Sequence, residues 1–429
     1  MVVSIVTDKG IFYMIASSYK QEDMRRLRMA RAAVIAFFFL NGVIVASWAA
    51  RIPAVQAKLA LSPGQLGLAL LGGAIGALVA MNTAGRMSKR FGSKVLTTIA
   101  ALCLCIALPL LAFAPNFPLL IVALLFFGAS SGAMDVTMNA QGADVERKYG
   151  RPIFNSFHAC FSVGGLVGAF LSGILATFNI APGPHFLVTA VCACIGIVVS
   201  ARFLLSLAPI VPGESVANER TQKVPLITIS RTLLLLGLIA FCALISEGAM
   251  SDWSAIYLSG VAHSGAGLAA AGFAIFSLCM AIGRGVGDYL AARFGPAVLV
   301  RIASSLAAIG LALALLIAWT PIVFVGLGLV GIGLSVIFPL VLSAASRTAK
   351  DKRDMGSALA NVTTCGYFGM LVGPPVIGFI ADQVGLRLAL ILVVCLCVIA
   401  ALCAPVVAIP GLQQEDNAVS LAASESLVP

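Results

Sequence analysis

The chain has 429 residues, of which 60% are hydrophobic and only 10% are charged. A soluble domain carries about 25% charged residues, so this composition excludes an ordinary soluble globular protein. The net charge of +10 does not indicate nucleic-acid binding, because the basic residues lie in short clusters between long apolar segments.

Apolar runs recur from residue 31 to residue 409, and each is long enough to cross a bilayer as a helix. The runs are continuous and do not alternate in polarity, which excludes a β-barrel. The expected fold class is therefore an all-α integral membrane protein with 12 transmembrane helices in two six-helix bundles. The predicted spans are 31–53, 64–84, 95–114, 118–141, 152–177, 184–205, 232–258, 265–290, 297–319, 321–345, 356–381 and 387–409.

The distribution of Lys and Arg supports an even number of spans with both termini inside. Of the 27 such residues, only Arg51, Lys58 and Arg387 fall on the outer side of this arrangement. We therefore expect the following order along the chain: a cytoplasmic N-terminal segment (1–30), an N-terminal six-helix bundle (31–205), a cytoplasmic linker (206–231), a C-terminal six-helix bundle (232–409) and a cytoplasmic tail (410–429).

Span 4 contains the strongest functional candidate, Asp135. A charged residue at the centre of a membrane helix costs about 2.5–3.5 kcal/mol on insertion scales, and burial favours the neutral acid. Gly128, Gly132, Asp135 and Asn139 fall on one helical face. The pattern predicts close helix packing together with a proton- or substrate-binding role for Asp135 and Asn139. The alternative is structural pairing of Asp135 with a basic group near the inner surface.

Spans 5 and 7 carry further candidates. Asn155 and His158 share a face of span 5, and His158 is predicted to exchange protons or to be a neutral hydrogen-bonded histidine. Glu247 in span 7 is predicted to couple protons or bind substrate. Trp253 is read as an interface anchor in preference to a sugar-stacking platform.

Other polar residues are assigned to gates or to substrate contacts. In span 8, Arg284 and Asp288 are four residues apart, which predicts a salt bridge at the inner end. The run 369–378 in span 11, rich in Gly and Pro, predicts a packing face and a kink. Further gating candidates are Arg86, Lys89 and Arg90, and further substrate candidates are Asn41 and Asn361.

Two sets of six spans, a central inner loop and a basic turn at 85–94 resemble the major facilitator superfamily. The turn reads Gly-Arg-Met-Ser-Lys-Arg-Phe-Gly-Ser-Lys, with Lys89 where that family has aspartate. The span-4 motif, an acid followed four residues later by Asn139, looks like the fucose-permease-like branch. Segments 155–158 and 247–253 resemble a poorly characterised bacterial inner-membrane subgroup near it.

This resemblance implies a secondary active transporter for a small polar solute, sugar or cyclitol-like, coupled to protons and working by alternating access. The alternatives are a drug or metabolite efflux antiporter of the same fold, and a non-transporting membrane receptor or scaffold. We expect no enzymatic activity, cofactor or metal site. The expected partners are the substrate, protons and the lipid bilayer, without nucleic acid, and the expected form is a monomer in the bacterial inner (plasma) membrane.

Overall fold

The computed structural model describes residues 2–150, 153–206, 230–348 and 352–408. Within these ranges it leaves undescribed the side chains of residues 2–23, 89, 155, 352–354 and 356. The predicted linker and C-terminal tail lie almost wholly outside the described residues, and the predicted bundle boundaries stay a prediction.

The described chain is helical and contains 12 helices long and apolar enough to cross a membrane. Each coincides with one of the twelve predicted spans, so the predicted fold class is confirmed. The elements are α1 (Val2–Lys58), α2 (Pro63–Phe91), α3 (Ser93–Phe113), α4 (Phe117–Tyr149), α5 (Phe154–Thr177), α6 (Pro182–Ala201), α7 (Arg231–Gly260), α8 (Ala266–Phe294), α9 (Pro296–Ile317), α10 (Thr320–Leu334), α11 (Ile337–Arg347), α12 (Lys352–Val384), α13 (Leu386–Ala389), α14 (Ile391–Cys403) and the short 3-10 helix η1 (Ala404–Val407).

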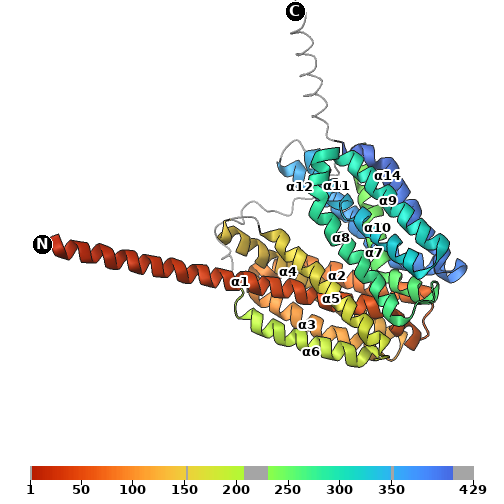
Figure 1. Ribbon diagram of the computed structural model, residues 1–429, viewed down its shortest axis with the longest axis horizontal. Coiled ribbons are helices and arrows are strands. Elements are labelled where there is room, and N and C mark those ends of the chain that lie inside the picture. Colours follow the sequence, from red (N-terminus) through yellow and green to blue (C-terminus); the bar gives the residue numbers. More distant parts are fainter. Residues whose placement is uncertain (1, 151–152, 207–229, 349–351, 409–429) are drawn as a thin grey trace, which may run out of the picture. The chain divides into compact units, whose positions relative to one another are not determined.

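Two helices differ from the sequence prediction. The first helix is continuous from Val2 to Lys58, so the N-terminal segment extends span 1 as one helix (Figure 1). The tenth span is broken at Ser335–Val336, between α10 and α11. Pro339 explains this break, because it has no N–H to donate to the carbonyl of Ser335 four residues earlier.

The structure divides into two compact units. Unit 1 comprises residues 1–48, 72–171 and 180–215, and unit 2 comprises residues 49–71, 172–179 and 216–429. In unit 1, the buried Gln141 of α4 bonds to α3 and to the segment that follows α6. Its amide nitrogen donates to Ser93 Oγ at 2.7 Å and to the Leu205 carbonyl at 3.0 Å, and its oxygen accepts from the Leu205 N–H at 3.1 Å. All the polar groups of this buried amide are thus engaged in structure.

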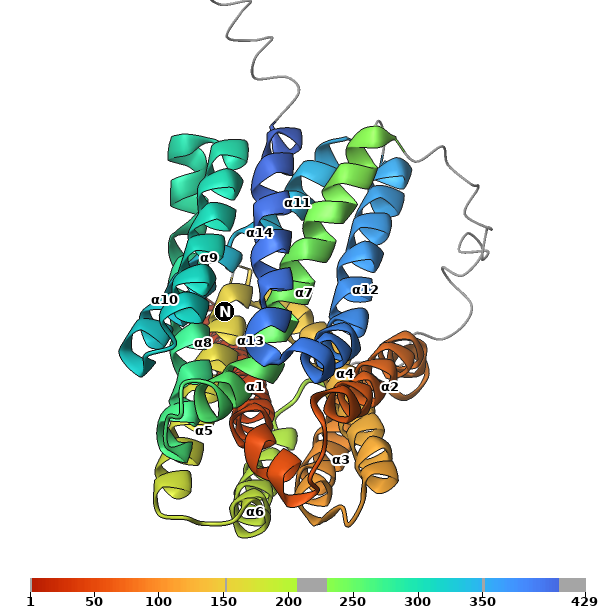
Figure 2. The same ribbon diagram turned by 90° about the vertical axis from the view of Figure 1, so that its right-hand side faces the viewer.

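In unit 2, α12 and α14 both pack along α7 (Figure 2). The predicted packing face of span 11 is confirmed, because a Cβ on Gly369 would lie 2.7 Å from the Phe241 carbonyl of α7. The segment before α2 also belongs to this unit. Ser62 Oγ donates to the carboxylate of Asp382 at 3.1 Å, and a Cβ on Gly378 would lie 2.5 Å from the Pro63 carbonyl.

The C-terminal end of α9 is capped by side chains from other helices. The Tyr257 hydroxyl of α7 donates to the Ala314 carbonyl at 2.9 Å. Arg387 of α13 donates from Nε to the Leu315 carbonyl at 2.6 Å and from Nη2 to the Leu316 carbonyl at 2.7 Å. The last carbonyls of a helix have no partner within it, so this arginine satisfies groups that lipid cannot. These bonds give a structural reason for Arg387, one of the three basic residues that do not follow the predicted distribution of Lys and Arg.

Replacing Arg387 with Leu is expected to lower the free energy of unfolding by about 1.5–3 kcal/mol, because two charge-assisted hydrogen bonds to α9 are lost. The measurement is thermal unfolding of the purified protein in detergent. Arg293→Leu is the matched control, since Arg293 is exposed and contacts only Tyr289 and Phe294 in the described chain. Equal unfolding temperatures for the two variants would show that the cap adds nothing to stability.

Candidate functional site

The middle of unit 2 contains an ion pair between two spans. Glu247 lies in α7, and Arg284 lies in α8 ten residues before its end at Phe294. Arg284 Nη2 lies 3.3 Å from Glu247 Oε1, and the two side chains are 47% and 24% exposed. A buried structural pair is enclosed and bonded at several points, whereas this pair is partly open and joined at one contact. The arrangement suits a pair that exchanges partners.

The predicted salt bridge between Arg284 and Asp288 is wrong for the described structure. Asp288 is exposed one turn further along α8, and the arginine pairs across to Glu247 instead. The sequence spacing correctly places Arg284 and Asp288 on neighbouring turns, but a carboxylate on the adjacent helix competes for the guanidinium. Arg284 is therefore an intramembrane residue near Glu247 and does not belong to the helix end.

In unit 1, Asp135 lies in the middle of α4 and is partly buried. The side-chain nitrogen of Asn139 donates to the Asp135 backbone carbonyl at 2.8 Å and to Asp135 Oδ1 at 3.1 Å. The prediction that the two share a face is confirmed. The alternative of a basic partner is not supported, because the carboxylate has no cation beside it among the described residues.

The small residues of the same face allow close packing, as predicted. A Cβ on Gly128 would lie 1.9 Å from the Gly73 carbonyl of α2, and one on Gly132 would lie 2.6 Å from the Ala77 carbonyl. Such distances leave no room for any side chain. The backbones of α2 and α4 therefore touch directly where this face of α4 leads to Asp135.

Asn41 of α1 and His158 of α5 belong to the same unit. Asn41 is 3% exposed, with its nitrogen 3.9 Å from Met138 Sδ and its oxygen without a hydrogen bond to any described residue. His158 is exposed, and its ring contacts Phe38 at 5.2 Å and Phe154 at 5.3 Å between centroids. The side chain of Asn155, a predicted neighbour of His158, lies outside the described residues.

The remaining candidates, on α7 and α12, make no hydrogen bond through their side chains within the described chain. Trp253 is fully buried, so its interpretation as an interface anchor is wrong. Its indole nitrogen has no hydrogen bond within the described ranges. Asn361 is partly exposed, without a partner in the part of the chain that the structure describes. Asp252 of α7 is also partly exposed, and no described residue forms a hydrogen bond or ion pair with its carboxylate.

The basic segment at the C-terminal end of α2 is exposed at Arg86 and Arg90. Arg86 Nε donates to the Asn82 carbonyl at 3.3 Å, and the guanidinium of Arg90 lies 5.3 Å from the ring of Phe91. The side chain of Lys89 lies outside the described residues. These contacts are local, and the predicted gating role stays a prediction.

Sequence reasoning missed Glu146, which joins α4 to α5. One carboxylate oxygen of Glu146 accepts from the backbone N–H groups of Ile153 and Phe154 at 2.7 and 2.6 Å, which stabilises the start of α5. An acid a few residues before a helix start is the signal that could have found it.

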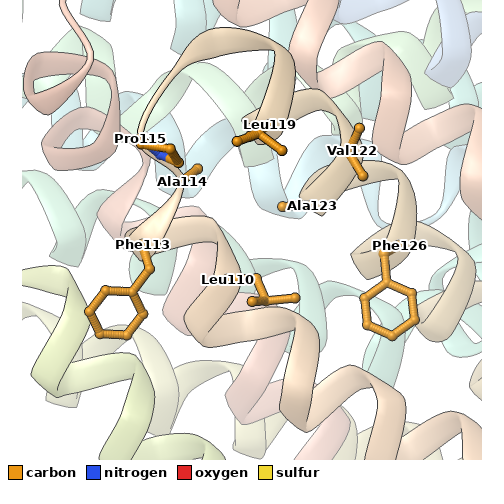
Figure 3. A pocket seen from close by; sticks show the side chains of 8 residues that line it. All are labelled: Leu110, Phe113, Ala114, Pro115, Leu119, Val122, Ala123 and Phe126. Atoms are coloured by element: carbon orange, nitrogen blue, oxygen red, sulfur yellow. The ribbon is translucent and has the colours of Figure 1, made fainter.

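A cavity of about 340 Å³ lies between α3 and α4 (Figure 3). No polar candidate lines it, so it does not suit a polar solute. Its lining residues are all apolar: Leu110, Phe113, Ala114, Pro115, Leu119, Val122, Ala123 and Phe126.

Twelve apolar helices that carry a few charged and amide groups in their interiors define a polytopic membrane carrier. The family model of the Major Facilitator Superfamily matches residues 32–366 and 319–423, and the chain belongs to this superfamily. It is thus a multi-pass membrane transporter, a class distinct from enzymes.

Two relatives from rhizobia match nearly the whole chain. One is an uncharacterised transporter, y4wD, of Sinorhizobium fredii, 35% identical, covering 89% of this chain and 99% of that protein. The other is the membrane protein MosC of Rhizobium meliloti, 34% identical, covering 88% and 90%.

Solved structures of two transporters share the fold. The nucleoside transporter NupG has a TM-score of 0.73 at 13% identity, covering 88% of this chain and 98% of that one. The D-xylose–proton symporter has a TM-score of 0.69 at 15% identity, covering 88% and 96%. At these identities the likeness shows the fold alone.

Gly128→Ala is expected to destabilise the protein by about 1–3 kcal/mol, because the added methyl group meets the Gly73 backbone and forces α2 and α4 apart. Gly85→Ala is the control, since a Cβ there would come no closer than 4.0 Å to Val136. Thermal unfolding in detergent measures both. If Gly128→Ala unfolds at the temperature of the unmodified protein, the close approach of these helices is not needed.

Proposed function

We propose that the protein is a proton-coupled secondary transporter that imports a small, hydroxylated, sugar- or cyclitol-like solute across the bacterial inner membrane. The observation that carries the proposal is Asp135, an acid in the middle of a span whose bonded partner is the neutral amide of Asn139. An acid without a cation beside it can take up and release a proton as its surroundings change from one side of the membrane to the other. The cost of keeping such a group in lipid favours a functional role.

Other residues support the solute site in this proposal. Glu247 or His158 assists the proton transfer, and the amides of Asn139, Asn155 and Asn361 bind hydroxyl groups. Both termini face the cytoplasm, on the charge distribution of the connections. The D-xylose–proton symporter, one of the fold's solved examples, illustrates this combination of sugar and proton.

Transport by the purified protein in proteoliposomes tests the proposal. The first step is a thermal unfolding screen with myo-inositol, D-xylose and uridine, followed by uptake of the radiolabelled solute that stabilises the protein. An imposed inward proton gradient is expected to drive accumulation above equilibrium. A gradient that drives only outward movement would instead support the efflux antiporter.

Asp135→Asn is expected to abolish gradient-driven accumulation while solute exchange without a gradient continues, because the amide cannot carry the proton. Asn82→Asp is the control for a change of charge at an exposed position, since the Asn82 side chain bonds only to the Leu78 carbonyl of its own helix. Accumulation that persists in Asp135→Asn would show that Asp135 is not the coupling group.

A further inference from the structure

Arg284 has donor capacity that the described protein does not use. Its Nη2 group donates to Glu247 at 3.3 Å, and its other guanidinium nitrogens have no acceptor among the described residues. A guanidinium carries five N–H donors in a planar fork that matches a carboxylate. The side chain is nearly half exposed although it lies well inside a membrane span. It is therefore available to a second acceptor.

The glycines beside Arg284 bring α8 against the broken tenth span. A Cβ on Gly283 would lie 2.3 Å from Ser335 Oγ, and one on Gly287 would lie 2.8 Å from Val336 Cγ1. Arg284 thus lies on the part of α8 that contacts the break between α10 and α11.

The surroundings of Arg284 leave room for a ligand. Only Ser335 and Val336 separate the carbonyl end of α10 from the first turn of α11, and both keep right-handed helical backbone angles. At Gly285, next to the arginine, a Cβ would meet nothing within 4 Å, so space is open there. Broken helices at mid-membrane depth are where transporters of several folds hold charged solutes.

Few other charges surround Glu247. The elements packed on α7 supply no ionisable residue from α10, only cysteines from α14 and only Arg347 from α11, where it bonds to Ser343. On α12 the described acid, Asp382, bonds to Ser62. Arg284 is the one described cation in contact with Glu247, so a change in the charge of Glu247 acts directly on this arginine.

We propose that Arg284 is the binding site for a carboxylate on the transported solute, which makes the substrate a hydroxylated organic acid such as a sugar acid. This inference rests on the proposed proton-coupled transport. A proton adds to the Glu247 carboxylate, its contact with Arg284 breaks, and the freed guanidinium binds the carboxylate of the solute. The proton on Glu247 balances the charge of the solute anion, and the proton that Asp135 carries in the proposed transport moves in addition to these two. On the other side both leave, and Glu247 pairs with Arg284 again.

The test compares acids with neutral polyols on the purified full-length protein. Binding of D-gluconate, D-glucuronate, D-glucose and myo-inositol is measured by thermal unfolding at two pH values, about pH 5.5 and about pH 7.5. An acid is expected to bind at least about tenfold more tightly than its neutral analogue, and more tightly at the lower pH.

The variants separate the roles of the two residues. Arg284→Gln is expected to weaken binding of the acid at least about tenfold, and Arg284→Lys to give an intermediate loss because lysine lacks the planar fork. Glu247→Gln mimics the protonated acid, so the binding should become independent of pH. Arg293→Gln, near the exposed end of the same helix, should bind as the unmodified protein does.

Equal binding of acids to the unmodified protein and to Arg284→Gln, or binding of neutral polyols alone, would overturn the carboxylate site. Proton-driven uptake of a neutral solute would then leave the proposed transport intact. In the opposite case, binding of an acid that depends on Arg284 without any proton-driven uptake would preserve the site and refute the coupling.

Discussion

In lipid, a polar group finds a partner within the protein or carries a cost of several kcal/mol, and this requirement organises the polar residues of the chain. Most of them are satisfied in ways that serve structure. Gln141 uses both ends of its amide to join α3, α4 and Leu205, which follows α6. Arg387 and Tyr257 donate to carbonyls in the last turn of α9. Among the described residues, the Asn41 oxygen, the Trp253 indole nitrogen and part of the Arg284 guanidinium lack a hydrogen-bond partner.

The same requirement explains the packing. Helices in lipid gain nothing by burying Leu against Leu rather than against acyl chains, so close backbone contact supplies the attraction. Gly128 against Gly73 in unit 1 and Gly378 against Pro63 in unit 2 are contacts of this kind. They place α4 and α12 at fixed positions, and Asp135 lies on the face of α4 that makes them.

Hydropathy was sufficient to predict the twelve spans, since length and apolarity are read from the local sequence. The sequence spacing also predicted that Asp135 and Asn139 share a face, because a separation of four residues is a local property of one helix. The pair between Glu247 and Arg284 was not predictable in this way. Its partners lie 37 residues apart, and the contact depends on how α7 and α8 are rotated against each other. Trp253 was misread for a related reason, because its depth could be judged from the sequence but its direction could not.

Asp135 and Glu247 meet the cost of burial in different ways, and the difference bears on coupling. Asp135 has a neutral amide beside it, so it gains or loses a proton without releasing another charged group. Glu247 has a cation beside it, so its protonation leaves Arg284 without a counter-charge in a medium where an isolated cation is costly. A solute that brings an anion removes that cost at the moment it arises. The acid with the cation is therefore the one through which proton uptake and solute binding favour each other, since each makes the other less costly.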